Sequence, residues 1–100
     1  NDSILNYGSL QIDTNNHRVV RDGVTVDLTV REYAILEYLV RNRNIVVTRE
    51  QIRANIWSID DDINSNVVDV YIRYLRRKID DPFEEKLIHT IRGVGYRLEC

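Results

Sequence analysis

The sequence lacks the features that mark a membrane protein or a disulfide-stabilised one. No apolar run approaches the roughly 20 residues that a membrane-spanning helix requires, so the pattern gives no support to a membrane role. The only cysteine is Cys100, at the end of the chain, which precludes an intrachain disulfide and favours a reducing, cytoplasmic location. The 100 residues, 43% hydrophobic and 30% charged, suit one domain spanning residues 1–100. Because the chain begins at Asn1 without a signal-peptide pattern, we expect it to be part of a longer protein.

Residues that could support catalysis are few and scattered. His17, His89 and Cys100 have no partner at a useful spacing. The segment Gly93-Val94-Gly95 is too short and wrongly placed for a nucleotide-binding glycine loop. The sequence therefore predicts neither an enzyme nor a cofactor.

A calcium-binding loop is the one metal site that the sequence suggests. Asp60, Asp62, Asn64 and Asn66 alternate as the ligands of an EF-hand do. The sixth position is Ser65 instead of glycine, however, and the twelfth is Tyr71 instead of a bidentate glutamate. We therefore predict no metal site.

The chain also lacks an excess of positive charge. Its net charge of −2 argues at first against nucleic acid, because neutralising phosphates requires lysine and arginine. The basic residues are concentrated, however. Val70 to Ile79 contains Arg73, Arg76, Arg77 and Lys78 and no acidic residue, whereas three consecutive aspartates stand at positions 60–62.

The first 28 residues predict a small antiparallel sheet. Apolar and polar residues alternate around Leu10–Ile12 and Val24–Leu28, and Val19–Val20 begins a further strand. The Thr14–Asn16 cluster separates the first two strands. Asp22-Gly23 predicts a two-residue hairpin turn before the third, since both residues tolerate positive φ.

Helices and a final hairpin follow. Two capping boxes begin the first two helices: Thr29 with Glu32, and Thr48 with Gln51. The first should end at 42–44, where an asparagine can adopt the left-handed cap, and the second at Trp57. After a loop at 58–65, a third helix should cover about residues 66–79, and strands at 87–91 and 96–100 should form the hairpin. The cap of the third helix is one of Asn64, Ser65 and Asn66.

The third helix has two different faces at 100° per residue. Val68, Ile72, Leu75 and Ile79 form a stripe that we expect to be buried. The opposite row consists of Asn66, Val70, Arg73, Tyr74 and Arg77. This row suits the major groove, because arginine can bind guanine, asparagine can bind adenine, and valine can contact a thymine methyl. Tyr71, Arg76 and Lys78 flank it, where they could approach phosphates.

A basic face on a helix is more often a solvated surface than a DNA-binding one, so solvent exposure is the alternative interpretation of this row. The exposed Val70 and Tyr74 favour a groove, since a solvated face has little reason to carry them. Asp69 we interpret as structural: it lies near the helix N-terminus and could hold a neighbouring basic side chain.

The C-terminal hairpin supplies a second candidate DNA contact. Its residues Thr90, Arg92, Gly93 and Tyr96 have the composition of a wing that reaches a minor groove or the adjacent backbone. An ordinary turn with a surface arginine would look much the same. The third helix and the hairpin together indicate DNA binding more strongly than either element alone.

These segments resemble the effector domain of OmpR/PhoB-type response regulators over essentially all 100 residues. The resemblance is carried by Thr29–Leu36, Val47–Ile52 with Trp57, Val68–Lys78, and Thr90–Tyr96. It implies an α+β winged helix-turn-helix in which the third helix enters the major groove and the wing meets the minor groove.

The resemblance also implies partners. In this family a receiver domain precedes the effector domain; its phosphorylated aspartate promotes dimerisation, and two effector domains bind direct-repeat half-sites in promoter DNA. The loop between the second and third helices contacts RNA polymerase, which here would involve Asp60, Asp61, Asp62 and Ile63.

Some positions depart from the family pattern. Asn44 replaces a frequent helix-ending glycine, which affects packing more than function. Tyr71 replaces a frequent histidine and Tyr74 a frequent basic residue, so the recognised base sequence stays open. The alternative function is a winged helix that binds protein, for which a more apolar and less charged third helix would be expected.

Overall fold

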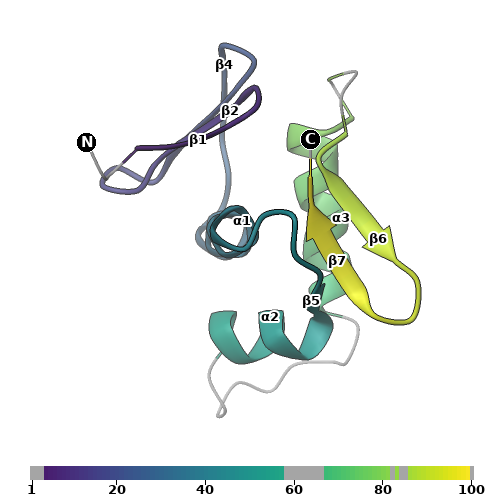
Figure 1. Ribbon diagram of the computed structural model, residues 1–100. Coiled ribbons are helices and arrows are strands. Elements are labelled where there is room, and N and C mark those ends of the chain that lie inside the picture. Colours follow the sequence, from purple (N-terminus) through teal and green to yellow (C-terminus); the bar gives the residue numbers. More distant parts are fainter. Residues whose placement is uncertain (1–3, 58–66, 82, 84–85, 100) are drawn as a thin grey trace.

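The computed structural model describes residues 4–57, 67–81, 83 and 86–99. Its elements are β1 (Ile4–Tyr7), β2 (Leu10–Asp13), β3 (Arg18–Arg21), β4 (Val24–Val26), α1 (Val30–Arg41), β5 (Val47–Thr48), α2 (Arg49–Ile56), α3 (Val67–Ile79), β6 (Ile88–Ile91) and β7 (Gly95–Leu98). This order confirms the predicted α+β fold of an N-terminal antiparallel sheet, three helices and a C-terminal hairpin. In Figure 1 the N-terminal sheet and the hairpin lie on opposite sides of α1.

The N-terminal sheet has the strand order β1-β2-β3-β4, with every pair antiparallel. Asp22 and Gly23 have φ angles of 53° and 80°. Two successive positive values are the mark of a type I′ turn, which confirms the predicted hairpin between β3 and β4. Strand β1 was not predicted; it pairs with β2, and Leu5 lies opposite Ile12.

The helix boundaries follow local capping interactions. Both predicted capping boxes are present, that of Thr29 with Glu32 and that of Thr48 with Gln51. Asn44, three residues beyond the end of α1, has a φ of 67°, as expected for a left-handed asparagine near a helix end. Trp57 is the C-cap of α2.

The core lies between the three helices and the two sheets. The predicted stripe of α3 is buried in full: Val68, Ile72, Leu75 and Ile79. It belongs to the same buried cluster as Leu36 of α1, Ile52 of α2 and Leu98 of β7. With its stripe fixed in this core, α3 must turn its opposite face outward.

The C-terminal sheet has three strands in the order β5-β7-β6. The predicted hairpin is β6 and β7, whereas β5 was not predicted. Gly95 of β7 lies so close to β5 that a Cβ atom on it would stand 2.1 Å from the carbonyl oxygen of Val47. Strand β5 runs directly into α2, so the hairpin is hydrogen-bonded to the start of that helix.

A buried arginine joins the N-terminal sheet to the end of α3. Arg21 of β3 is 1% exposed, and its guanidinium donates to the carbonyl oxygen of Ile79 and lies 3.4 Å from a carboxylate oxygen of Asp80. Asp80 in turn accepts the backbone N–H groups of Leu87 and Ile88, each at 3.1 Å. The C-terminal end of α3 is thus hydrogen-bonded to β3 on one side and to the start of β6 on the other.

Candidate nucleic-acid interface

The outward face of α3 carries three of the residues that the sequence predicted there: Arg73, Tyr74 and Arg77 are exposed. Val70 was expected to be exposed as well, and this is corrected, because it is half-buried. Neither Arg73 nor Arg77 makes a hydrogen bond or ion pair with any other residue in the described part of the chain. Both guanidinium groups are therefore available to an external partner. Asn66 lies outside the described residues, as do Asp60, Asp61, Asp62 and Ile63 of the expected polymerase-contacting loop.

The three flanking residues of α3 each contact another element of the protein. The ammonium group of Lys78 donates to Glu32 at 2.6 Å. Arg76 donates to the carbonyl oxygen of Ile88 at 3.3 Å and to the hydroxyl of Thr90. The ring of Tyr71 packs 5.4 Å from that of Trp57, centroid to centroid. These side chains fix the position of α3 against α1, β6 and the end of α2.

The turn of the hairpin presents a second exposed surface. Arg92, Gly93 and Val94 are exposed between β6 and β7, and Thr90 is exposed on β6. Among the described residues, Arg92 makes no hydrogen bond or ion pair. The wing tip therefore offers one free cation, while Thr90 is held through Arg76.

Tyr96 lies beneath this surface, and this corrects its expected position among the exposed wing residues. It is only 4% exposed, and its hydroxyl donates to Asp69 of α3. The same carboxylate accepts Nε of Arg49 at 2.7 Å. The guanidinium carbons of Arg49 and Arg76 lie 5.5 and 5.8 Å from the centre of the tyrosine ring. Tyr96 thus joins β7 to α2 and α3.

Asp69 remains a carboxylate at this junction. Burial opposes its ionisation, but hydrogen bonds from Tyr96 and Arg49 outweigh burial and hold its pKa below the ordinary value. Burial, together with the hydrogen bond to Asp69, raises the pKa of Tyr96, which stays a neutral donor. The expectation that Asp69 could hold a basic side chain is confirmed, and the partner is Arg49.

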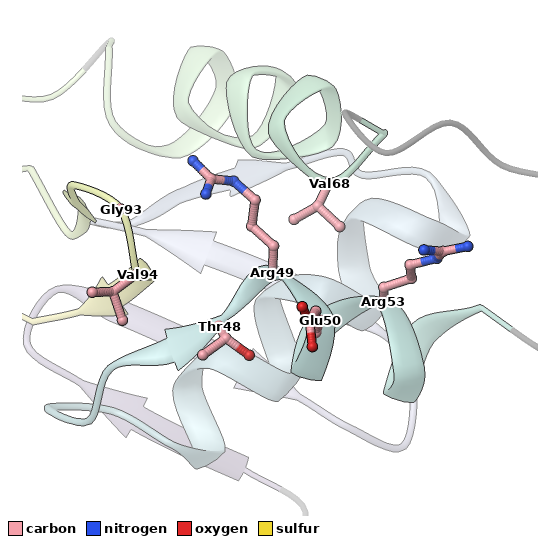
Figure 2. Close-up of a pocket in the computed structure, with 7 residues that line it drawn as sticks. All are labelled: Thr48, Arg49, Glu50, Arg53, Val68, Gly93 and Val94. Carbon is pink, nitrogen blue, oxygen red and sulfur yellow. The ribbon is translucent and has the colours of Figure 1, made fainter.

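A pocket of about 530 Å³ lies beside this junction, between the starts of α2 and α3 and the wing tip (Figure 2). Its lining consists of Thr48, Arg49, Glu50, Arg53, Val68, Gly93 and Val94. Figure 2 shows the side chains of Arg49 and Arg53 diverging from α2 on either side of Val68. Neither arginine was singled out from the sequence, although their i,i+4 spacing on a helix places them on one face.

The whole chain resembles proteins whose names describe transcription regulation. Residues 23–98 match the family described as "Transcriptional regulatory protein, C terminal". The chain belongs to this family. The response regulator ArlR of Staphylococcus saprophyticus is 46% identical over 94 residues, which are 94% of this chain and 43% of ArlR. The chain spans 42–43% of the length of the first curated relatives that it matches.

Solved structures of the OmpR/PhoB type share the fold of this family member. DrrB, a Thermotoga maritima OmpR/PhoB homologue, superposes with a TM-score of 0.86 at 35% identity, covering 98% of this chain and 45% of DrrB. The DNA-binding domain of Klebsiella pneumoniae RstA, solved in complex with the RstA box, gives 0.84 at 30% identity and covers 96% of each chain. The family is one of DNA-binding transcription regulator domains of response regulators, not of enzymes.

No helix in the described part of the chain is long and apolar enough to cross a bilayer. Within the same part of the chain, no three histidine, cysteine, aspartate or glutamate side chains come together as metal ligands would.

Proposed function

We propose that this domain binds double-stranded promoter DNA by sequence, with α3 in the major groove and the wing, at about residues 87–100, at the minor groove. The observation that carries the proposal is the outward face of α3. It presents Arg73 and Arg77, which make no hydrogen bond or ion pair among the described residues, opposite a stripe buried in the core. Arginine bonds two acceptors of guanine in the major groove, and each such pair discriminates by about 1–3 kcal/mol.

The wing and the pocket extend this surface. Arg92 at the wing tip can enter a narrow minor groove or contact its phosphates. We propose that Arg49 and Arg53 at the start of α2 lie along the phosphate backbone beside the same groove, because their pocket adjoins both α3 and the wing tip. The solved complex of RstA with its box supports DNA as the ligand of such a surface.

For the whole protein we propose a cytoplasmic response regulator, since its relatives of that name are more than twice as long as this chain. The resemblance to the family supports three further properties of the whole protein. A receiver domain would drive dimerisation, two effector domains would bind direct-repeat half-sites, and the loop at 58–65 would contact RNA polymerase.

The test begins with selection of bound sites from random duplex DNA by the domain. With the selected site, Arg73→Ala should weaken binding by about 1–3 kcal/mol, which is roughly 5- to 150-fold, if Arg73 contacts a base. Arg92→Ala should weaken binding less selectively and lower the dependence of affinity on salt. Arg18→Ala is the matched control, because it removes the same charge from an exposed position on β3.

Loss of affinity in the Arg73 and Arg92 variants, with the control unchanged, supports this assignment. Unchanged affinity in both variants would contradict these residue roles, whereas failure to select any duplex would favour the alternative of a protein-binding winged helix.

A further inference from the structure

An acidic side chain lies among the cations of the proposed DNA-binding surface. Asp69 stands four residues before Arg73 on α3, so the two side chains adjoin on one face of the helix. The Asp69 side chain is 36% exposed, so part of the carboxylate faces the outside. DNA is a polyanion, and an exposed carboxylate beside it opposes binding by repulsion. The negative charge of Asp69 therefore has a consequence for DNA binding as well as for the fold.

The arginine that pairs with this carboxylate is Arg49 of α2. Its Nε donates to Asp69 at 2.7 Å, and its guanidinium carbon lies 5.5 Å from the centre of the Tyr96 ring. The hydrogen bond and the ring contact together limit the positions that the guanidinium can take. Arginine has five N–H donors, so the bond through Nε leaves donors at the Nη atoms for a phosphate. Figure 2 shows the side chain of Arg49 extending from the start of α2 toward α3.

Arg53, one turn further along α2, shows how an unpaired arginine differs. It lines the same pocket, is exposed, and makes no hydrogen bond or ion pair among the described residues. Its charge attracts any phosphate within about 8 Å, the screening length at physiological ionic strength, whatever the base sequence. The pair of Arg49 and Asp69 has no net charge and exerts little attraction at that range. It can bind only a phosphate that reaches the remaining donors of Arg49.

We propose that Asp69 is a specificity-determining residue, which cancels the long-range attraction of Arg49 for DNA and holds Arg49 in position for one phosphate of a correctly aligned duplex. A duplex in any other register lies near the exposed carboxylate without gaining the contact with Arg49. Specificity is a difference between two affinities, and a repulsive group raises it by weakening the wrong complex. This inference rests on the proposed DNA binding and goes beyond the structural role of Asp69.

Asp69→Asn tests the role of the charge, because the amide oxygen of asparagine can still accept from Tyr96 and Arg49. Affinity is measured over a range of salt concentrations for the selected duplex and for a duplex of scrambled sequence. For the scrambled duplex, the slope of log affinity against log salt should steepen by about 0.9, the value for one more phosphate neutralised. At about 0.1 M salt this corresponds to roughly 8-fold tighter binding.

The selected duplex should be bound no more tightly by Asp69→Asn than by the unmodified domain. Its gain from the released charge is offset, because a neutral amide holds Arg49 by weaker hydrogen bonds than a carboxylate does. The ratio of the two affinities, selected to scrambled, should therefore fall by roughly 8-fold. A purely structural role of Asp69 would weaken both complexes and would leave the salt slope unchanged.

Asp22→Asn is the matched control for the loss of one negative charge. Asp22 is exposed in the turn between β3 and β4, and asparagine followed by glycine is a preferred sequence for a type I′ turn. This variant should keep both the affinity ratio and the salt slope of the unmodified domain.

Two further variants test whether Asp69 acts through Arg49. In an Arg49→Ala background, the effect of Asp69→Asn on the ratio should largely disappear, since no arginine remains to be released. Arg49→Lys keeps the charge but lacks the planar group that Asp69 and Tyr96 hold. It should weaken binding to the selected duplex by about 3- to 10-fold and leave the scrambled duplex unchanged.

Three results would overturn the inference. If Asp69→Asn leaves the ratio and the salt slope unchanged while Arg73→Ala still weakens binding, the DNA-binding function stands and the role of Asp69 is refuted. An undiminished effect of Asp69→Asn in the Arg49→Ala background would refute the role of the pair. If Asp69→Asn does not fold, Arg49→Lys decides, and an equal loss for both duplexes refutes the inference. If no duplex is selected at all, the function and this inference fail together.

Discussion

Tyr96 lies beneath the proposed DNA-binding surface and joins the elements that form it. Its hydroxyl and ring meet groups from α2 and α3 through Asp69 and Arg49. In the proposed binding mode the exposed row of α3 and the wing tip bind the two grooves simultaneously, so their separation matters. We expect the buried junction around Tyr96 to set that separation, because β7 contacts both helices there.

Replacing Tyr96 by phenylalanine tests this role. The ring stays, but the hydrogen bond to Asp69 is lost, which should destabilise the domain by about 1–2 kcal/mol and weaken DNA binding. Because Tyr96 acts through Asp69, the effects of Tyr96→Phe and Asp69→Asn should not add. A double-mutant cycle, measured by urea denaturation and by DNA titration, should give a coupling of about 1 kcal/mol. Full additivity would mean that the two residues act separately.

The sequence could predict the exposed row of α3 but not the position of Tyr96. A helix places every third or fourth residue on one side, so burial of Val68 and Ile72 determines where Arg73 points. In β7, by contrast, three of the four residues are buried, without the alternation of a half-exposed hairpin. As the middle strand of its sheet, β7 lies among partners that its own residues do not reveal.

At the scale of elements, the start of α1 combines two stabilising contacts in one side chain. Glu32 accepts the N–H of Thr29 at 3.0 Å, completing the capping box, and also accepts from Lys78 of α3 at 2.6 Å. Its side chain is only 4% exposed. Burial would raise the pKa of Glu32, but the hydrogen bonds from Lys78 and Thr29 outweigh burial and leave this pKa below its ordinary value of 4.5.

A carboxyl whose pKa is lowered on folding stabilises the fold above its unfolded-state pKa, and the benefit is lost as pH falls through the folded-state pKa. Glu32→Gln should therefore lower the free energy of unfolding by about 1–2 kcal/mol at pH 7. The difference from the unmodified domain should shrink below pH 4.5. Urea denaturation across this range measures it, and Glu50→Gln, at an exposed position of α2, is the control. A difference independent of pH would refute the role of the charge.

The starts of α1 and α2 were predictable because a capping box uses residues three positions apart. The two capping boxes were therefore read correctly from the sequence. Strand β5 was not, because its two residues become a strand only by pairing with β7, nearly fifty positions later. The pattern of a segment predicts structure when its partners are local, and fails when they are distant.

At the scale of the whole molecule, Arg21 connects the N-terminal sheet to the helical unit. Its guanidinium also donates to Ser9 at 2.7 Å and lies 4.9 Å from the centre of the Phe83 ring. An arginine this deeply buried is rare unless it is paired. The local sequence pattern does not reveal this pairing, since Asp80 stands 59 positions away.

Arg21→Met should destabilise the domain strongly. Removing one partner of a buried ion pair leaves the other charge uncompensated, at a cost of about 3–5 kcal/mol. We expect a lower urea midpoint, with Arg18→Met on the same strand changing stability by less than about 0.5 kcal/mol. A loss below about 1 kcal/mol for Arg21→Met would show that the remaining contacts join the sheet to α3 without it.

The contact of Gly95 with the carbonyl of Val47 has a consequence for protein engineering. Any side chain at position 95 would force β7 away from β5 and would displace α2, the helix that follows β5. A wing transplanted from another regulator would therefore keep its geometry only if residues 47–48 travelled with residues 95–98 as a single cassette. Between the strands, positions 92 and 94 can be exchanged while Gly93, whose φ is 75°, stays glycine, so these two positions are the place to graft new preferences for the proposed minor-groove contact.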